Sequence, residues 1–340
     1  MPVVETGSTA VPTVPLPLGV GILGCADIAL RRFLPVLARS EKARLVAIAS
    51  RDADRALEVA GRFGCHATGY RELLRSDRVD LVYIPLANHL HEEWVIEALN
   101  HGKHVLCEKP LGLSPDSVNR MLDAADRNGV LLYENLMYLR HPQHAMIKAM
   151  LEAGRIGAVT GLSCEFTFPG PAPGNFRLDP RQGGGAFHDL NRYPLSAAGY
   201  FLKGALSEIV SCETAWQGEL LSSMDAQART TDGERFTFSI AFDRPYRCCY
   251  EIFGATGSLR LERAFTSPAD LECRLDIRAD GGCETILMPA RDHFLLTLDH
   301  VAGLIKRGGD FSGEHQRWRE LAVSADRFLR HATLQRGHHE

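Results

Sequence analysis

The sequence predicts an α/β fold in two domains: a parallel-sheet domain at residues 17–137, then an α+β domain at residues 138–334 with a large, open, mostly antiparallel sheet. In the first part, short continuous apolar runs alternate with segments of helical periodicity, as expected for a parallel sheet covered by helices on both faces. After Tyr138 the pattern changes to mostly strands. The 340 residues, 45% of them hydrophobic, are also too many for one ordinary core.

Five strands and four helices are expected in the first domain. The strands are 18–23, 44–50, 79–84, 104–107 and 130–133, and the helices are 28–38, 52–63, 92–100 and 115–128. Pro35 predicts a kink in the first helix. Gly64 can end the second helix, and Ser114 can cap the fourth.

The second domain is expected to begin with a helix at 144–153 and a strand at 159–168, followed by a Pro/Gly-rich loop at 169–180 and a helical segment from Gly185 to Phe201. Strands fill 207–288, with hairpin turns at 232–233 and 254–257. Two amphipathic helices, 292–306 and 314–332, close the chain. Residues 1–16 carry three prolines and no basic residue, so we interpret them as a flexible extension and not a secretory signal.

Composition argues against several classes of protein. The net charge is −4, and Lys and Arg are scattered, so the basic stripe of a nucleic-acid binder is missing. No apolar run approaches the ~20 residues of a membrane span. The nine cysteines show no C-x-x-C spacing, which disfavours a zinc site or a disulfide framework and favours a reduced cytoplasm. No metal site is expected.

A turn rich in small residues follows the first strand. Gly19, Gly21 and Gly24 match G-x-G-x-x-G, but the first two lie inside the expected strand. The turn is therefore predicted to be Gly24-Cys25-Ala26-Asp27-Ile28-Ala29. Gly24 allows the tight turn, Ala26 allows close approach of a pyrophosphate, and the helix N-terminus supplies N–H donors.

The residues after the second strand indicate which dinucleotide binds. NAD enzymes usually place Asp or Glu there, whereas this chain has Ser50-Arg51, with Arg55 one helical turn later. A guanidinium binds a 2′-phosphate and stacks on adenine, so we predict NADP(H). Asp52 lies one residue after the position at which NAD enzymes place their acidic residue. The alternative to NADP(H) binding is that Arg51 and Arg55 are solvated surface charges.

Two further segments are expected at the same carboxyl edge, where open α/β sheets bind ligands. Leu86 can line the nicotinamide or ribose, and Asn88 and His91 can bond to the cofactor or, alternatively, cap the next helix. Glu108-Lys109-Pro110 follows the fourth strand and places an ammonium group at this edge.

Together these segments resemble the Gfo/Idh/MocA oxidoreductase family over nearly the whole chain. The resemblance rests on 19–24, 88–91, 102–111, 138–142, 183–189 and 254–259. It implies a Rossmann domain that binds the cofactor, Glu108 included, and an open antiparallel sheet that builds the substrate pocket and often an oligomer interface. A homo-oligomer, dimer or tetramer, is therefore expected.

The resemblance also assigns reacting residues. It implies that Lys109 points at substrate and cofactor, and that Asp189 and Tyr193, which share a helix face, reach the same pocket. A phenol holds its proton at neutral pH, and we expect the ammonium beside Tyr193 to lower its pKa and to stabilise a developing alkoxide. His188 is interpreted as structural.

Within the family, residues 175–194 look like the sugar 3-ketoreductases of deoxysugar pathways. The implied activity is reduction of a keto group, at C3, on a TDP-linked 4-keto-2,6-dideoxyhexose, as in antibiotic biosynthesis. Four arginines are available for the sugar-nucleotide diphosphate: Arg31, Arg32, Arg177 and Arg181. The alternative for each of them is a solvated surface charge. The alternatives are an NADP-dependent dehydrogenase of a free sugar or polyol, and a non-catalytic nucleotide-sensing regulator.

Overall fold

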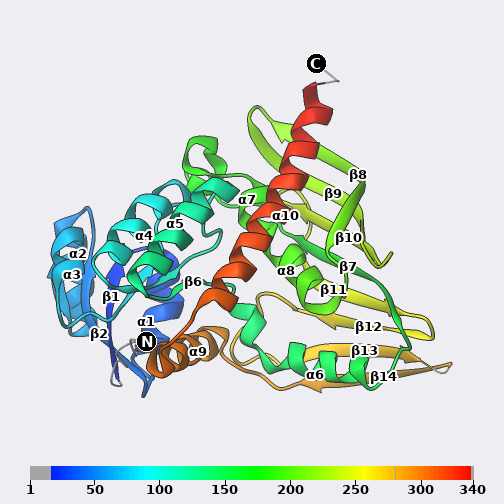
Figure 1. Ribbon diagram of the computed structural model, residues 1–340, viewed down its shortest axis with the longest axis horizontal. Helices are drawn as coiled ribbons and strands as arrows, with labels where there is room; N and C mark the ends of the chain where they lie inside the picture. Colours follow the sequence, from blue (N-terminus) through cyan, green and yellow to red (C-terminus); the bar gives the residue numbers. More distant parts are fainter. Residues whose placement is uncertain (1–16, 280, 338–340) are drawn as a thin grey trace, which may run out of the picture.

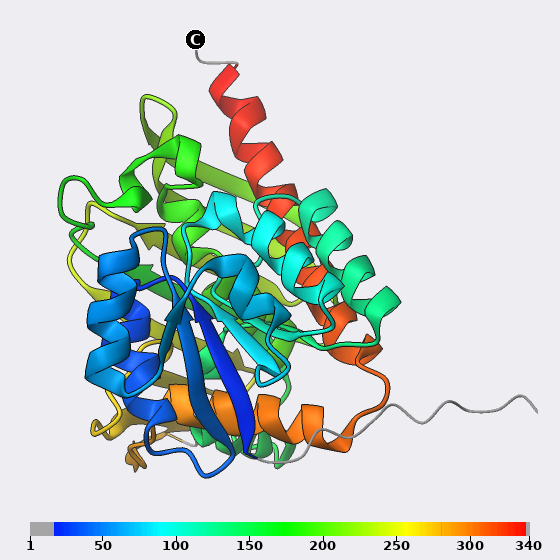
Figure 2. The ribbon, with the colours of Figure 1, turned by 90° about the vertical axis from the view of Figure 1, so that its left-hand side faces the viewer.

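The computed structural model describes residues 17–279 and 281–337, so the predicted flexible extension at 1–16 lies outside the described residues. The first domain contains a parallel sheet of strands β1 (Leu18–Leu23), β2 (Ala43–Ala49), β3 (His66–Thr68), β4 (Leu81–Ile84), β5 (His104–Cys107) and β6 (Leu132–Glu134). Their order is β3-β2-β1-β4-β5-β6, which is the strand order of a Rossmann fold. The predicted fold class of this domain is confirmed (Figures 1 and 2).

Helices α1 (Leu34–Leu37), α2 (Ala53–Phe63), α3 (Tyr70–Arg75), α4 (His91–Asn100) and α5 (Pro115–Asn128) connect these strands. The first expected helix is not α-helical throughout, because a π-helical turn at Ala29–Phe33 precedes α1. Pro35, which has no N–H to donate, stands in the first turn of α1, beside this change. β3 and α3 were not predicted, because elements of three and six residues are too short to show a period.

The second domain is built on an eight-stranded sheet of β7 (Val159–Thr167), β8 (Leu206–Gln217), β9 (Leu220–Thr230), β10 (Arg235–Ala241), β11 (Arg247–Gly254), β12 (Gly257–Glu262), β13 (Cys273–Ala279) and β14 (Gly282–Met288). The order is β14-β13-β12-β11-β7-β10-β9-β8, with β7 and β10 parallel and the other pairs antiparallel. Both hairpin turns form where predicted, between β9 and β10 and between β11 and β12.

The second domain contains helices α6 (Pro142–Glu152), α7 (Ala186–Leu190), α8 (Arg192–Phe201), α9 (His293–Arg307) and α10 (Ser312–Gly337). α8 packs on β7, and α7 packs on β9 and β10. The two C-terminal helices also contact the first domain, because α9 packs against α1 and α10 against α5 and β6. Figure 1 shows α10 running between the two sheets, so this helix joins both domains.

Candidate active site

The turn after β1 is shaped for a phosphate. Gly24 has φ +111°, and its N–H donates to Ala49 O at 2.7 Å. A Cβ on Gly24 would lie 2.8 Å from Leu86 Cδ2, and φ +111° is a conformation that residues with a side chain rarely adopt. The first backbone N–H groups of the helix that begins at Asp27 have no acceptor within the helix itself, which suits an anion. As predicted, Gly19 lies inside β1, where a Cβ would meet Arg78 O at 1.9 Å.

The residues after β2 leave one guanidinium available. The Ser50 hydroxyl accepts from the Asp52 N–H at 3.2 Å, and the Asp52 carboxylate accepts from the Arg55 N–H at 3.0 Å as the N-cap of α2. The Asp52 carboxylate is therefore used as the N-cap of α2. Arg55 forms an exposed ion pair with Glu58 at 2.7 Å. Arg51 is exposed and forms no ion pair with any residue that the structure describes.

Asn88 and His91 lie at the expected edge, but they bind backbone there. Asn88 Nδ2 donates to Gly183 O at 2.8 Å, which links the two domains. The buried His91 ring places Nδ1 2.8 Å from Pro110 O and Nε2 3.0 Å from Leu86 O. Neither side chain caps the following helix. His91 holds the loop after Lys109 against the loop after β4, and burial lowers its pKa.

Glu108 is fixed by two donors at the end of β5. Its Oε1 accepts from the Tyr83 hydroxyl at 2.7 Å and from Asn135 Nδ2 at 2.6 Å. Burial and the Glu108 carboxylate raise the pKa of Tyr83 well above its ordinary value, so this phenol keeps its proton.

Lys109 meets Asp189 across the domain boundary. Lys109 Nζ donates to Asp189 Oδ1 at 2.6 Å and to the Asp189 carbonyl at 2.7 Å, and both side chains are about 10% exposed. Arg177 Nε donates to the same Oδ1 at 2.9 Å. Burial favours the neutral acid, but the two cations prevail and lower the pKa of Asp189. Lys109 and Asp189, which the resemblance placed at one pocket, lie together, and Arg177 joins them.

Tyr193 completes this cluster. Lys109 Nζ lies 5.5 Å from the centroid of its ring, which packs among Phe166, Phe265 and Tyr138. Among the described residues, the Tyr193 hydroxyl has no hydrogen-bond partner. Burial, followed by the Asp189 and Glu108 carboxylates, raises the pKa of Tyr193 well above its ordinary value. The expectation that Lys109 lowers the pKa of Tyr193 was wrong, because burial and the Asp189 carboxylate outweigh the lysine charge.

The other candidate residues lie outside this cluster. Arg31 lies 3.6 Å from Asp27, and Arg181 pairs with Asp179 at 3.1 Å; both arginine side chains are well exposed. Arg32 is exposed on the π-helical turn. Burial lowers the pKa of His188 to about 4, as fits a structural imidazole. Two residues that sequence reasoning missed, Glu134 and Arg192, form a buried ion pair beside the cluster.

The described part of the chain contains no helix long and apolar enough to cross a membrane. The same residues contain no group of three or more His, Cys, Asp or Glu side chains placed to hold a metal ion. All nine cysteines are free thiols, and most of them are buried.

Comparisons with known proteins agree with this geometry. Residues 18–136 match the family described as "Oxidoreductase family, NAD-binding Rossmann fold", and residues 144–260 match the "GFO/IDH/MocA C-terminal domain". The chain is 39% identical over 308 residues to dTDP-3,4-didehydro-2,6-dideoxy-alpha-D-glucose 3-reductase of Actinomadura kijaniata, covering 89% of this chain and 91% of the relative. It is 33% identical to D-xylose 1-dehydrogenase (NADP(+)) 2 of Haloferax volcanii, covering 85% and 89%.

Among solved structures, a 3-ketoreductase from Actinomadura kijaniata in complex with NADP and TDP-benzene superposes with a TM-score of 0.87 at 36% identity, covering 91% of this chain and 96% of that one. Variants of the same enzyme, with a lysine or a tyrosine replaced, also superpose. With both domains matched in order and this identity over nearly the full length, the chain belongs to the Gfo/Idh/MocA oxidoreductase family.

Proposed function

We propose that the protein reduces a keto group, at C3, of a TDP-linked 4-keto-2,6-dideoxyhexose with NADPH. The observation that carries the proposal is the meeting of Lys109, Asp189 and Tyr193 from two domains. This cluster lies at the carboxyl edge of the parallel sheet, on the side of the Gly24 turn. The names of the relatives support the same substrate class.

The residues after β1 and β2 fit NADPH, which supplies the hydride when bound. The positive φ of Gly24 suits a diphosphate held against the turn by backbone N–H groups. Arg51 has its guanidinium free for a 2′-phosphate, because Asp52 is used as a helix cap. The NADP complexes of the solved relative are consistent with this choice.

The reacting pair acts on the substrate oxygen. Two of the three N–H donors of Lys109 are held by Asp189, which leaves one for the oxygen that becomes negatively charged during reduction. Tyr193 keeps its proton at every physiological pH and has its hydroxyl free to donate it. The lysine and tyrosine replaced in the solved variants are separated by the same number of positions as Lys109 and Tyr193, which supports the pairing.

Arg177 is the residue best placed for the charged part of the substrate. One of its nitrogens binds Asp189, and a third of its side chain remains exposed. A guanidinium offers five donors, so those not used by Asp189 are available to a phosphate oxygen. Arg181, held by Asp179 at the loop surface, is placed further out.

The test is NADPH oxidation, followed by absorbance, in the presence of freshly generated TDP-linked 3,4-diketo-2,6-dideoxyhexose. We expect turnover with this substrate, no turnover with TDP alone, and an NMR spectrum of the product with a new hydroxyl at C3. Binding of NADPH without turnover on any keto sugar would contradict the proposal and favour a nucleotide-sensing regulator.

A second candidate function, oxidation of a free aldose with NADP⁺, is favoured by the similarity to D-xylose 1-dehydrogenase. It predicts nicotinamide reduction when D-xylose or a polyol is mixed with NADP⁺. The same cluster would bind the sugar, with Lys109 and Tyr193 hydrogen-bonded to the hydroxyl that is oxidised. The ratio of kcat/KM for the two substrates decides between the candidates.

We also propose a cytoplasmic homo-oligomer. Nine free thiols are in keeping with a reducing compartment.

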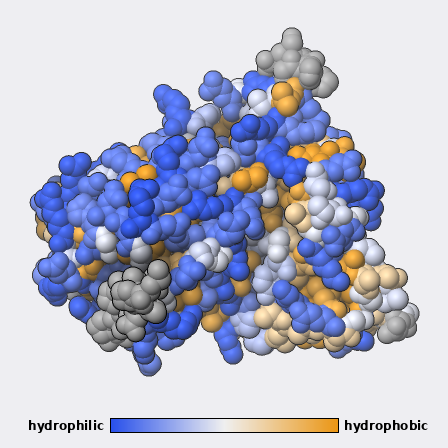
Figure 3. Space-filling view, in the orientation of Figure 1, coloured by the Kyte–Doolittle hydropathy of each residue, from blue (hydrophilic) through white to orange (hydrophobic). Residues whose placement is uncertain are grey.

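The face of the eight-stranded sheet away from α7 and α8 carries a row of ion pairs, among them Arg247–Glu165 at 2.9 Å and Arg260–Glu262 at 2.8 Å. In the view of Figure 3, hydrophobic residues are most frequent over the second domain, on the right. Light scattering coupled to size-exclusion chromatography tests the assembly, and a monomer would contradict it.

A further inference from the structure

A buried ion pair joins the two domains next to the reacting cluster. Arg192 Nε lies 3.0 Å from Glu134 Oε1, and the two side chains are only 3% and 1% exposed. Glu134 ends β6 of the first sheet, and Arg192 begins α8, the helix that carries Tyr193. Among the described residues, no hydrogen bond connects either side chain to Lys109 or to the Tyr193 hydroxyl, so the chemistry proposed above does not use them.

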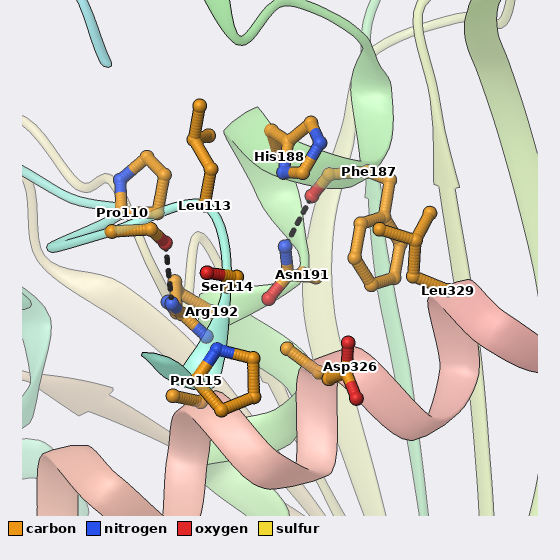
Figure 4. Close-up of a pocket in the computed structure, with 13 residues that line it drawn as sticks. Pro110, Leu113, Ser114, Pro115, Phe187, His188, Asn191, Arg192, Asp326 and Leu329 are labelled. Atoms are coloured by element: carbon orange, nitrogen blue, oxygen red, sulfur yellow. Dashed lines mark hydrogen bonds between the residues drawn. The ribbon is translucent and has the colours of Figure 1, made fainter. Parts of the chain in front are cut away.

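The pair also holds the loop that follows Lys109. Glu134 Oε1 accepts from the Leu111 N–H at 3.0 Å, and Arg192 Nη2 donates to Gly112 O at 3.2 Å. Arg192 Nη1 donates to Leu321 O of α10 at 3.3 Å. Figure 4 shows Arg192 reaching the loop at Pro110–Pro115, with α10 on the other side of the pocket. One network therefore fixes this loop, the start of α8 and the middle of α10.

Stability alone does not explain such a pair. Removing two charges from water costs more than their attraction returns in many proteins, and an apolar pair of similar size is often as stable. A guanidinium, by contrast, presents its donors in a rigid plane and can hold a carboxylate and two carbonyls in fixed directions. The network thus suits a role in geometry, and a small displacement of a reacting group costs rate.

We propose that Glu134 and Arg192 are positioning residues, which fix the distance between Lys109 and Tyr193 across the domain boundary. Leu111 and Gly112 follow Lys109 directly in the chain, and Tyr193 follows Arg192. A shift of either segment therefore moves one member of the reacting pair relative to the other. This inference rests on the proposed function, since that function gives Lys109 and Tyr193 their roles.

The test is the double variant Glu134→Leu/Arg192→Met, which removes the network but fills its space with apolar side chains. We expect kcat to fall about 20-fold or more, with KM and the NADPH dissociation constant changed less than about threefold. A merely structural pair would leave kcat unchanged in folded protein, and that result would overturn the proposal. Arg192→Lys provides a second measurement, because it keeps the charge opposite Glu134 but loses the planar fork; kcat should fall there too.

The matched control is Arg140→Met/Glu314→Leu, which removes an ion pair at 3.4 Å between Arg140 and α10, away from the loop after Lys109. It should leave kcat within about twofold of the wild type. Hydrogen exchange of residues 109–113 adds a readout that needs no substrate. Faster exchange there in the Glu134/Arg192 variant, but not in the control, is expected. Unchanged exchange would overturn the proposal. If the wild type fails to reduce the keto sugar, the proposed function fails, while exchange still tests whether the network holds the loop.

Discussion

At the scale of single residues, the site depends on how Asp189 is shared. Its Oδ1 accepts from both Lys109 and Arg177, so one carboxylate orients the ammonium of one domain and the guanidinium of the other. Because two cations surround it, Asp189 stays ionised. In the proposed reaction, the ammonium that Asp189 orients stabilises the negative charge that develops on a substrate oxygen.

Replacing Lys109 by Met should remove this charge and little of the packing. We expect kcat to fall by about 10²–10³-fold, in line with the loss of one preorganised donor to a developing oxyanion, while NADPH binding measured by fluorescence stays near the wild-type value. Lys103→Met is the control, because Lys103 Nζ donates to Ser76 O at 2.8 Å beside the opposite end of β5. A Lys109 variant with full activity would refute the mechanism.

Tyr193→Phe isolates the hydroxyl. The ring keeps its contacts with Phe166 and Phe265, and the hydroxyl has no partner among the described residues, so the melting temperature should not change. We expect a loss of about 10²-fold in kcat if the phenol delivers the proton. A loss below about fivefold would make Lys109 the main proton donor.

Arg51→Ala should change the choice of cofactor. Without the free guanidinium, the dissociation constant of NADPH should rise about tenfold or more, whereas that of NADH, which has no 2′-phosphate, should stay nearly constant. Arg62→Ala, at the far end of α2, serves as the control and should change neither value. Equal weakening of both cofactors by Arg51→Ala would show that Arg51 does not read the 2′-phosphate.

At the scale of elements, alanine substitutions at two glycines with positive φ test NADPH binding and folding stability separately. Gly24→Ala places a side chain at φ +111°, a strained conformation for alanine. The turn should therefore shift, and NADPH binding should weaken about tenfold or more. Gly64→Ala, at the end of α2 with φ +67° and open space around it, should cost about 1–2 kcal/mol of stability without altering NADPH affinity. Calorimetric titration and thermal melts measure both. NADPH affinity unchanged by Gly24→Ala would place the diphosphate elsewhere.

The elements and the site differ in how much the sequence predicts of them. β1, a continuous apolar run, and α5, a long amphipathic segment, have the bounds that the sequence predicts, because each carries its own local pattern. The placement of Lys109 and Tyr193 followed from a family resemblance, and the structure brings them together.

Two contacts between segments distant in the chain were not predicted, for a physical reason. The Glu134–Arg192 pair and the Asn88 link to Gly183 join residues far apart in sequence, and a single polar residue leaves no period by which to find its partner. The pKa of Tyr193 was expected to move in the wrong direction because burial and Asp189, both properties of the folded chain, outweigh the nearby ammonium.

At the scale of the whole molecule, a buried histidine cluster joins α6, the start of α9 and the second sheet. The rings of His141 and His293 lie 4.8 Å apart, and His144 Nδ1 lies 2.8 Å from the Tyr250 hydroxyl of β11. All three imidazoles are at most 4% exposed. Burial lowers the pKa of His141 to about 4, that of His293 to about 3, and that of His144 well below its ordinary value.

Folding stability should therefore fall as the pH drops below about 6.5, the ordinary pKa of histidine. In that range the imidazoles bind protons in the unfolded chain but stay neutral in the folded one. Each imidazole therefore lowers the free energy of unfolding by about 1.4 kcal/mol per pH unit until its folded pKa is reached. Denaturant unfolding between pH 7.5 and 5 measures the slope. His144→Phe should reduce it, whereas replacement of the exposed His66 by Gln should not. Stability that is constant over this interval would mean that the cluster takes up protons while the protein remains folded.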